Sequence, residues 1–167
     1  MKTIGIVVPV RRMAGQLQNL ETWLSTCLSF QQISVYLVHD WGDEQTWEEL
    51  HELVTRLGNK NIILSQCWAE NPGGARNFGF QQSNDDYLIF WDSDDIGYVD
   101  RMVEVLDTNL GKDVIICNFE MEFLGSPDRI VKKHFGEFRQ VYKSPGLWRF
   151  LFKREFIENV KFDEFTM

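Results

Sequence analysis

Short apolar runs alternate with longer amphipathic stretches along the chain. The runs are rich in β-branched and aromatic residues and are continuous, which is typical of strands that are covered on both faces. Five of them are predicted as strands, at residues 3–10, 33–38, 61–64, 87–91 and 114–119. Between the strands, apolar residues recur at helical spacing and predict helices at residues 17–28 and 44–57. A short helix is predicted at 74–82, after a Pro-Gly-Gly turn, and another helix at 99–110. This alternation predicts an α/β fold: a mostly parallel, Rossmann-like sheet with helices on both faces.

The pattern changes beyond residue 123. Residues 130–138 are predicted as an antiparallel pair or hairpin, and residues 147–157 as one more helix. No linker rich in Pro, Gly or Ser divides the 167 residues. We therefore expect a single domain over residues 1–167, with a first part at 1–125 and a second part at 126–167.

Composition and charge exclude several classes of protein. Hydrophobic residues make up 44% of the chain and charged residues 25%, which is close to the globular average. The net charge of −8 argues against a nucleic-acid partner, because such binding rests on cationic surface. The apolar runs are far shorter than the roughly 20 residues that cross a bilayer. Cys27, Cys67 and Cys117 are widely spaced, which predicts free thiols in a reducing, cytoplasmic compartment.

Three carboxylates, Asp92, Asp94 and Asp95, follow directly on the apolar run 87–91. Ligands of open α/β sheets bind beyond the carboxyl ends of strands, and clustered carboxylates suit Mg²⁺ or Mn²⁺. An EF-hand loop starting at Asp92 is excluded, because Ile96 and Val103 stand where oxygen ligands are needed. Two alternatives remain open: a polar turn with a helix cap, and an aspartyl-nucleophile phosphatase, although that family carries its motif on the first strand.

A second informative segment is Gly73-Gly74-Ala75-Arg76 at the start of the helix predicted at 74–82. Glycines let a backbone approach a ligand closely, and amides at a helix start attract anions. Arg76 can make bidentate contacts with phosphate. The segment lacks the Gly-Lys-Ser/Thr ending of an ATPase loop. The alternative interpretation is a simple turn followed by a surface arginine.

Together, these segments resemble glycosyltransferases of family 2, which have the nucleotide-sugar-binding GT-A fold. The resemblance covers nearly the whole chain and rests on the order of Val8-Pro9-Val10, the segment 73–79, the acidic loop 92–95 and the stretch 148–164. It implies that Pro9 and Val10 line the base and ribose pocket and that Gly73 and Gly74 approach the donor. It also implies that Asp40 meets the base, Arg76 lies by the base or diphosphate, Asp92 faces the ribose, and Asp94 with Asp95 holds the metal.

The resemblance implies transfer of a sugar from a nucleoside diphosphate donor to an acceptor hydroxyl, with inversion and with Mn²⁺ or Mg²⁺. A uridine diphosphate sugar is the expected donor, and a glycan or lipid-linked molecule in surface polysaccharide synthesis is the expected acceptor. Residues 1–125 would bind the donor, and residues 126–167 would form part of the acceptor side. Eight Lys/Arg and one Glu in 129–154 suggest peripheral contact with the inner face of a membrane, and apolar residues near residue 167 suggest self-association.

The chain departs from the family pattern in two places. His39 stands where the family has a first acid, and Trp41 adds bulk next to Asp40. The catalytic carboxylate is expected after Glu164 and is not assigned to any residue, because the sequence stops at Met167. The alternative function is therefore a non-catalytic nucleotide-sugar-binding module, or a fragment that lacks the general base. A nucleotidyltransferase is disfavoured because residues 11–15 are poor in glycine.

Overall fold

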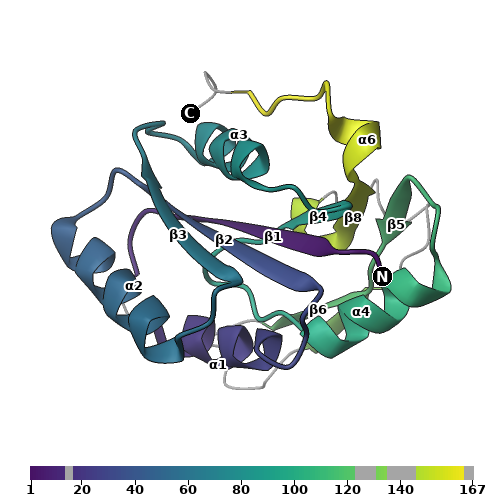
Figure 1. The fold of residues 1–167 in the computed structure, drawn as a ribbon, viewed down its shortest axis with the longest axis horizontal. Helices are drawn as coiled ribbons and strands as arrows, with labels where there is room; N and C mark the ends of the chain where they lie inside the picture. The colour runs from purple at the N-terminus through teal and green to yellow at the C-terminus, as the bar shows by residue number, and fades with distance from the viewer. Residues whose placement is uncertain (14–16, 123–130, 135–145, 164–167) are drawn as a thin grey trace.

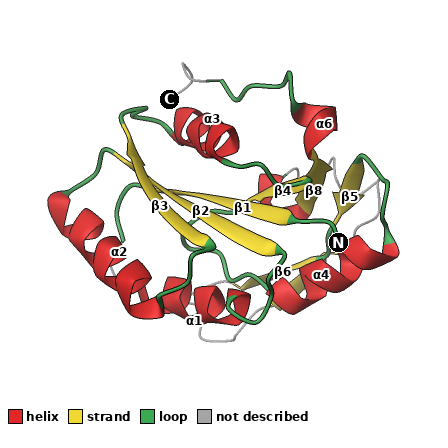
Figure 2. Cartoon of the chain, in the orientation of Figure 1, coloured by secondary structure: helices red, strands yellow, loops and turns green. Residues whose placement is uncertain are grey.

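The computed structural model describes residues 1–13, 17–122, 131–134 and 146–163. The helices are α1 (Leu17–Cys27), α2 (Glu44–Leu57), α3 (Pro72–Gln82), α4 (Val99–Thr108) and α6 (Arg154–Ile157), with a 3-10 turn, η1, at Leu147–Arg149. The strands are β1 (Ile4–Val10), β2 (Ile33–Asp40), β3 (Ile62–Cys67), β4 (Tyr87–Phe90), β5 (Val114–Ile116), β6 (Phe119–Glu122), β7 (Val131–His134) and β8 (Phe150–Lys153). Figure 2 shows their alternation along the first half of the chain.

A six-stranded sheet forms the centre of the molecule, in the order β3-β2-β1-β4-β8-β5. β1 runs parallel to β2 and to β4, and β2 runs parallel to β3. β8 runs antiparallel between β4 and β5. The chain therefore winds outward from β1 to β3 and then returns to the other side of β1, which creates a switch point between β1 and β4.

Helices cover both faces of the sheet, as the sequence predicts (Figure 1). Alternate side chains of β1, such as Ile6 and Val8, pack with Leu24 of α1, Leu50 of α2 and Leu106 of α4. On the other face, the apolar cluster joins Val7, Tyr36, Leu88, Phe90 and Ile157, with Phe80 of α3 packed against it. The predicted α/β fold class is confirmed.

Local sequence fixes where the central helices begin and end. Asp43 caps α2 by accepting from the Thr46 amide at 2.7 Å, and Gly58 ends it in the left-handed conformation with φ of 59°. Asn71 caps α3 by accepting from the Gly74 amide at 2.7 Å, and Pro72 occupies the first turn, where a missing amide costs nothing.

The prediction of one helix over residues 147–157 is wrong. The segment forms the η1 turn, then the strand β8, and only then the short helix α6. Leu151 is buried with α1 and α4, whereas Phe152 packs on the opposite face of the sheet. This alternation has period two, and β8 supplies the backbone partners of both β4 and β5. A short apolar run does not reveal such a period by itself.

The strand expected at 114–119 ends early. β5 stops at Ile116, and Phe119 begins β6, which pairs antiparallel with β7. Of the antiparallel pair expected at 130–138, only 131–134 is described, and its partner is β6. All three cysteines are free, as predicted. Among the described residues, no helix combines the length and apolar composition that crossing a bilayer requires.

Candidate functional site

The sequence-predicted site residues lie at one edge of the sheet. Val10, Asp40 and Phe90 stand at the carboxyl ends of β1, β2 and β4, and the first turn of α3 follows the end of β3. Parallel neighbours end at the same edge, so the β4–α4 loop and the α3 start are brought together there. This edge includes the β1–β4 switch point, where open α/β sheets bind ligands.

The acidic loop after β4 is folded around backbone contacts. Asp95 accepts from the Asp92 amide through Oδ2 at 3.0 Å and donates its own amide to the Asp92 carbonyl at 3.1 Å. Trp91 anchors the start of the loop by donating from Nε1 to the Trp148 carbonyl at 3.2 Å. Gly97 closes the turn over the Trp91 ring, where an added Cβ would lie only 1.9 Å from a ring carbon. The loop is therefore a defined turn.

Arg76 and Asp92 join the two predicted segments directly. Arg76 Nη2 donates to Asp92 Oδ1 at 2.5 Å, and the two side chains are 17% and 39% exposed. The contact is charge-assisted and spans 16 positions of the chain. Arg76 Nε is buried and has no hydrogen-bond partner in the described part of the chain. The guanidinium therefore holds Asp92 while keeping an unused donor.

The three predicted carboxylates do not converge. Asp92 faces Arg76, Asp95 is turned to the Asp92 amide, and Asp94 is exposed. No group of three or more His, Cys, Asp or Glu side chains within the described residues is arranged to hold a metal ion. The donor chemistry nevertheless fits a hard cation, because Asp94 and Asp95 offer carboxylate oxygens on one short loop. Mn²⁺ or Mg²⁺ with substrate phosphates would complete such a site.

Burial raises the pKa of Asp95 to about 6, and the neighbouring Asp92 and Asp94 act in the same direction. The folded state therefore binds a proton at Asp95 more readily than the unfolded chain does. Stability should fall as the pH rises from about 4 to about 6 and stay low above that range.

Replacing Asp95 with Asn is expected to stabilise the metal-free chain by about 1–2 kcal/mol near pH 7.5, because Asn accepts from the Asp92 amide without carrying a buried charge. The gain should shrink towards pH 4, where Asp95 of the folded chain is protonated and carries no buried charge. Urea unfolding at the two pH values measures it. Asp107→Asn, an exposed change on α4, is the control, and an equal gain in both variants would contradict the assignment.

Asp40 organises the loop between β3 and α3. The carboxylate is 3% exposed, and its Oδ1 accepts from the amides of Ala69 and Glu70 at 2.8 and 2.9 Å. Glu70 takes a left-handed conformation with φ of 61°, which turns its amide toward Asp40. Oδ2 accepts no hydrogen bond from the described residues. Asp40 therefore holds the loop with one oxygen, and its other oxygen has no hydrogen-bond partner among the described residues.

The glycines at the α3 start serve close packing. A Cβ on Gly74 would lie 2.6 Å from the Ala69 Cβ, and one on Gly73 would lie 2.2 Å from the Asp163 carbonyl oxygen. The Gly74 amide is already donated to Asn71 Oδ1. The expected anion-binding amides are thus partly used by the helix cap, and both glycines lie against protein rather than open space.

Pro9 and Val10 occupy the last two positions of β1, paired with Val38 and His39 of β2. Val10 is fully buried, side chain and backbone alike, whereas Pro9 is partly exposed. His39 is buried as well, and burial lowers its pKa. The centroid of its ring lies 5.7 Å from that of the Trp47 ring on α2.

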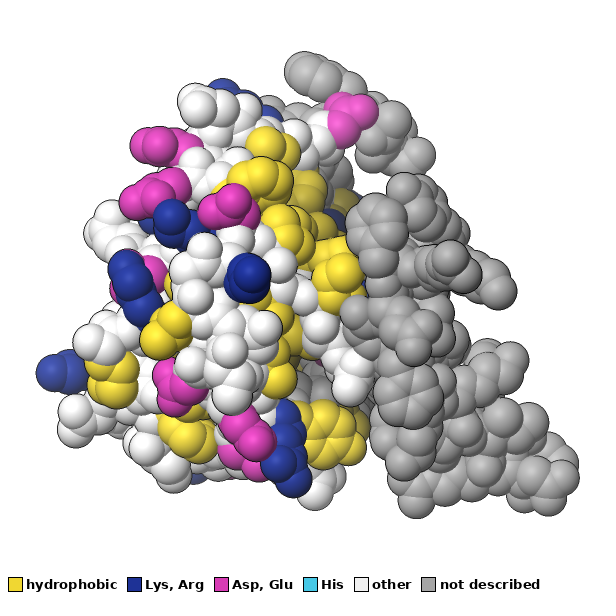
Figure 3. Space-filling view, turned by 90° about the vertical axis from the view of Figure 1, so that its right-hand side faces the viewer, with side chains coloured by type: hydrophobic (Ala, Val, Ile, Leu, Met, Phe, Trp, Pro, Cys, Tyr) yellow, Lys and Arg dark blue, Asp and Glu magenta, His cyan; other side chains and the backbone are white. Residues whose placement is uncertain are grey.

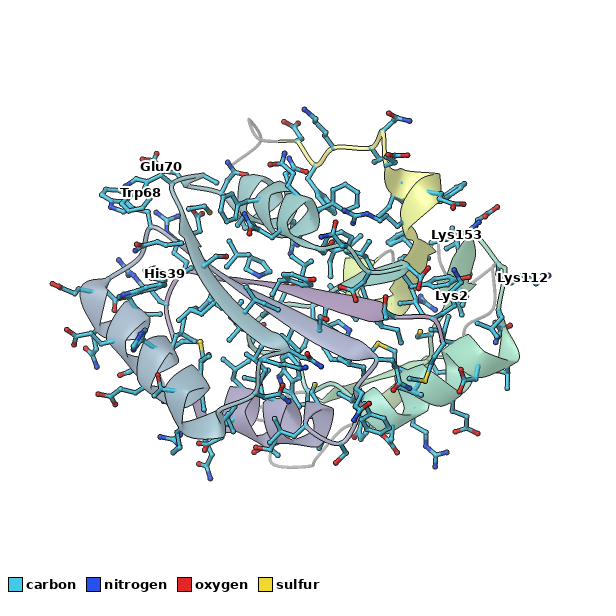
Figure 4. The ribbon with its side chains drawn as sticks, in the orientation of Figure 1. Lys2, His39, Trp68, Glu70, Lys112 and Lys153 are labelled. Atoms are coloured by element: carbon cyan, nitrogen blue, oxygen red, sulfur yellow. The ribbon has the colours of Figure 1, made fainter. Side chains whose placement is uncertain are left out.

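A cavity of roughly 210 Å³ opens beside these strand ends, lined by Arg11, Arg12, Trp41, Gly42 and Asp43. A side chain at Gly42 would collide with the Arg11 carbonyl, since an added Cβ would lie 1.8 Å from it. Trp41 is 49% exposed at the cavity. Trp68, which follows β3 in the same register, is also exposed and projects outward from the loop (Figure 4). The sequence identified Trp41 only as a departure from the family pattern and did not show that it lines a cavity.

Two residues of the site escaped the sequence analysis. Asn77, next to Arg76 on α3, binds the backbone of Phe162 through both ends of its amide. Phe162 packs edge-on against Phe90 with ring centroids 4.9 Å apart. Asn77 lies inside the segment 73–79 that carried the resemblance. Its contact with Phe162 could not be predicted, because the two residues are 85 positions apart in the sequence.

The predicted basic stretch 129–154 is only partly described. Arg149 is fully buried, Lys153 pairs with Glu155 at 2.7 Å, and Arg154 donates to carbonyls of Phe80 and Ser83. On the face seen in Figure 3, the described Lys/Arg and Asp/Glu side chains are interspersed. Arg149 and Arg154 are therefore held within the fold, Lys153 forms a surface ion pair, and the other basic positions lie outside the described side chains.

A mostly parallel sheet whose polar side chains gather at the carboxyl ends of its strands is typical of nucleotide-binding α/β proteins. Residues 6–166 match the model of glycosyl transferase family 2. The chain belongs to that family, which confirms the resemblance seen in the sequence. An uncharacterized glycosyltransferase of Haemophilus influenzae is 25% identical over 129 residues, covering 74% of this chain and 48% of that protein.

Solved structures confirm the fold. TarS of S. aureus in complex with UDP superposes with a TM-score of 0.76 at 17% identity, covering 97% of this chain and 50% of that chain. The mannosyltransferase PcManGT of Pyrobaculum calidifontis, in complex with GDP-Man and Mn²⁺, gives 0.68 at 13% identity, covering 99% and 48%. The chain therefore spans about half the length of the relatives that it matches.

Proposed function

We propose that this chain binds a nucleoside diphosphate sugar at the carboxyl edge of its sheet and transfers the sugar to an acceptor hydroxyl. The observation that carries the proposal is the Arg76–Asp92 contact, which joins the α3 turn to the acidic loop at the β1–β4 switch point. Family membership and the UDP, UDP-GlcNAc and GDP-Man complexes of similar structures support this class of donor.

The diphosphate would lie between Arg76 and the acidic loop. Asp94, with Asp95, would hold Mn²⁺ or Mg²⁺, which when bound stabilises the charge of the departing nucleoside diphosphate. Arg76 would add a fixed cation beside the same phosphates, and its unpartnered Nε supplies a donor for a phosphate oxygen. Asp92, oriented by Arg76, would accept from a ribose hydroxyl.

The base would enter beside Asp40 and the cavity at Trp41. Because Oδ1 of Asp40 is occupied by the Ala69 and Glu70 amides, Oδ2 is the acceptor left for the base. One acceptor suits the single ring N–H of uracil better than the two adjacent donor groups of guanine. A uridine diphosphate sugar is therefore the proposed donor. Trp41 would supply a stacking face for the base, and Pro9 with Val10 would form the pocket floor.

Replacing Trp41 with Ala is expected to weaken UDP binding about tenfold, because base–aromatic stacking is worth roughly 1–3 kcal/mol. Trp41→Phe should retain most of the affinity. Trp68→Ala is the matched control, since Trp68 follows the neighbouring strand and does not line the cavity. Calorimetry with UDP measures all three, and equal losses at positions 41 and 68 would refute base stacking on Trp41.

The acceptor is proposed to be a hydroxyl of a glycan or lipid-linked molecule in surface polysaccharide synthesis. It would attack the anomeric carbon of the donor sugar from the side of residues 126–167, with inversion at that carbon and departure of the nucleoside diphosphate. The protein is also proposed to lie at the inner face of a membrane, because of the basic stretch 129–154. Its proposed self-association rests on exposed apolar residues such as Phe156 and Val160. No described residue is assigned as the general base.

The direct test is product analysis with UDP-GlcNAc and Mn²⁺, with and without acceptor glycans. The proposal predicts release of UDP. Release of pyrophosphate from UTP in a parallel reaction with a sugar 1-phosphate would indicate a nucleotidyltransferase, and tight UDP binding without turnover would indicate a binding module. Failure to bind any nucleoside diphosphate would overturn the donor site itself.

A further inference from the structure

The C-terminal segment 160–163 passes over the first turns of α3 (Figure 1). A Cβ on Gly73 would lie 2.2 Å from the carbonyl oxygen of Asp163, a contact that no flexible side chain could relieve because the atom belongs to the backbone. The position therefore requires glycine for the segment to lie where it does. Gly73 therefore allows α3 and the C-terminal segment to pack closely at this point.

Asn77 clamps the same segment one turn further along α3. Its Nδ2 donates to the Phe162 carbonyl at 3.0 Å, and its Oδ1 accepts from the Phe162 amide at 2.9 Å. The side chain is 7% exposed, so both bonds form away from water. A buried amide that satisfies both backbone groups of one residue fixes that residue like a short piece of sheet ladder.

The Phe162 ring connects the clamp to the donor site. It packs edge-on against Phe90, the last residue of β4, directly before the acidic loop. The guanidinium carbon of Arg76 lies 5.8 Å from the ring centroid, and the same guanidinium binds Asp92. Two neighbouring residues of α3 therefore hold the two segments. Arg76 holds the acidic loop, and Asn77 holds the C-terminal segment.

We propose that Asn77 is a positioning residue of the transfer reaction, which fixes segment 160–163 relative to Arg76 and Asp92. The inference rests on the proposed function, because it concerns how the acceptor side of the chain is held against the donor. A nucleophile and its base must be placed to within a fraction of an ångström for efficient transfer. Asn77 acts through the Phe162 backbone and touches neither donor nor acceptor.

Asn77→Ala removes both hydrogen bonds and is expected to lower turnover of UDP-GlcNAc with Mn²⁺ about tenfold or more while UDP affinity changes less than about threefold. Asn77→Asp keeps the acceptor for the Phe162 amide but sets a buried carboxylate oxygen against the Phe162 carbonyl, so its turnover should also fall about tenfold or more. Ser83→Ala is the matched control, because Ser83 is fully buried at the far end of α3 and bonds Phe80 and Arg154. Its turnover should stay within about twofold of the wild type.

Amide hydrogen exchange at Phe162 gives a readout independent of activity. Asn77→Ala should speed that exchange about tenfold or more, and Ser83→Ala should leave it unchanged. Unchanged exchange in Asn77→Ala overturns the clamp, and parallel losses of turnover and UDP affinity overturn the positioning role. A wild-type chain without turnover contradicts the proposed transfer and with it the positioning role, whereas the exchange rate still decides whether Asn77 holds the segment.

Discussion

Replacing Asp94 with Ala is expected to lower donor turnover about a thousandfold and to abolish the Mn²⁺-dependent part of UDP binding, since a bound cation stabilises transition-state charge by several kcal/mol. The side chain is exposed and makes no hydrogen bond to the described residues. Its loss therefore removes the proposed metal ligand without breaking a contact of the loop, and the urea midpoint should change little. Turnover and calorimetric UDP titrations with and without Mn²⁺ measure the effect.

Asp100→Ala is the control for general acidity near the site. Asp100 lies in the first turn of α4, a few positions beyond the loop, and is also exposed. Its removal should leave Mn²⁺-dependent UDP binding within about twofold of the wild type. Equal losses from both variants would show that Asp94 contributes only to the field of the acidic surface.

Replacing Arg76 with Ala is the second large effect. It leaves Asp92 without its cation, removes the guanidinium proposed to bind the diphosphate and takes away the contact with the Phe162 ring. We expect UDP affinity to fall about a hundredfold, because charge-assisted phosphate contacts are the strong ones, and stability to fall by about 1–3 kcal/mol. Arg76→Lys should recover part of both, since it restores the charge without the planar fork.

Arg56→Ala provides the comparison for a solvated ion pair. Arg56 Nη2 lies 2.8 Å from Glu21 Oε1, but both side chains are well exposed. This variant should bind UDP like the wild type and unfold at nearly the same urea concentration. If Arg76→Ala behaved in the same way, the Arg76–Asp92 contact would contribute neither to the stability of the fold nor to UDP binding.

The sequence was sufficient for the strands of the parallel core. Runs such as 33–38 are continuous and β-branched because both faces of β2 are covered, and α1, α2 and α4 each show one apolar stripe. It was insufficient for β8, because an apolar run of only four residues does not distinguish a strand from a helix. Whether Phe150–Lys153 forms a strand depends on the open edges of β4 and β5, which lie far away in the sequence.

In the candidate site, too, features set by neighbouring residues could be predicted, whereas contacts between residues far apart in the sequence could not. The acidic loop and Arg76 were recognisable from residue type and order, and the structure brings Arg76 and Asp92 together. The different contacts of the three carboxylates were not recognisable, because the contact of Asp95 with the Asp92 amide depends on how the loop is folded. The packing role of Gly73 and the clamp at Asn77 depend on a segment some 85 positions away. Neither leaves a local signal.

A calorimetric titration of UDP into the wild-type chain, with and without Mn²⁺, tests the central claim most directly. If the β4–α4 loop and α3 jointly bind a metal–diphosphate unit, Mn²⁺ should tighten UDP binding about tenfold or more, and uridine alone should show no such dependence. Identical UDP affinity in the presence and absence of the cation would contradict it.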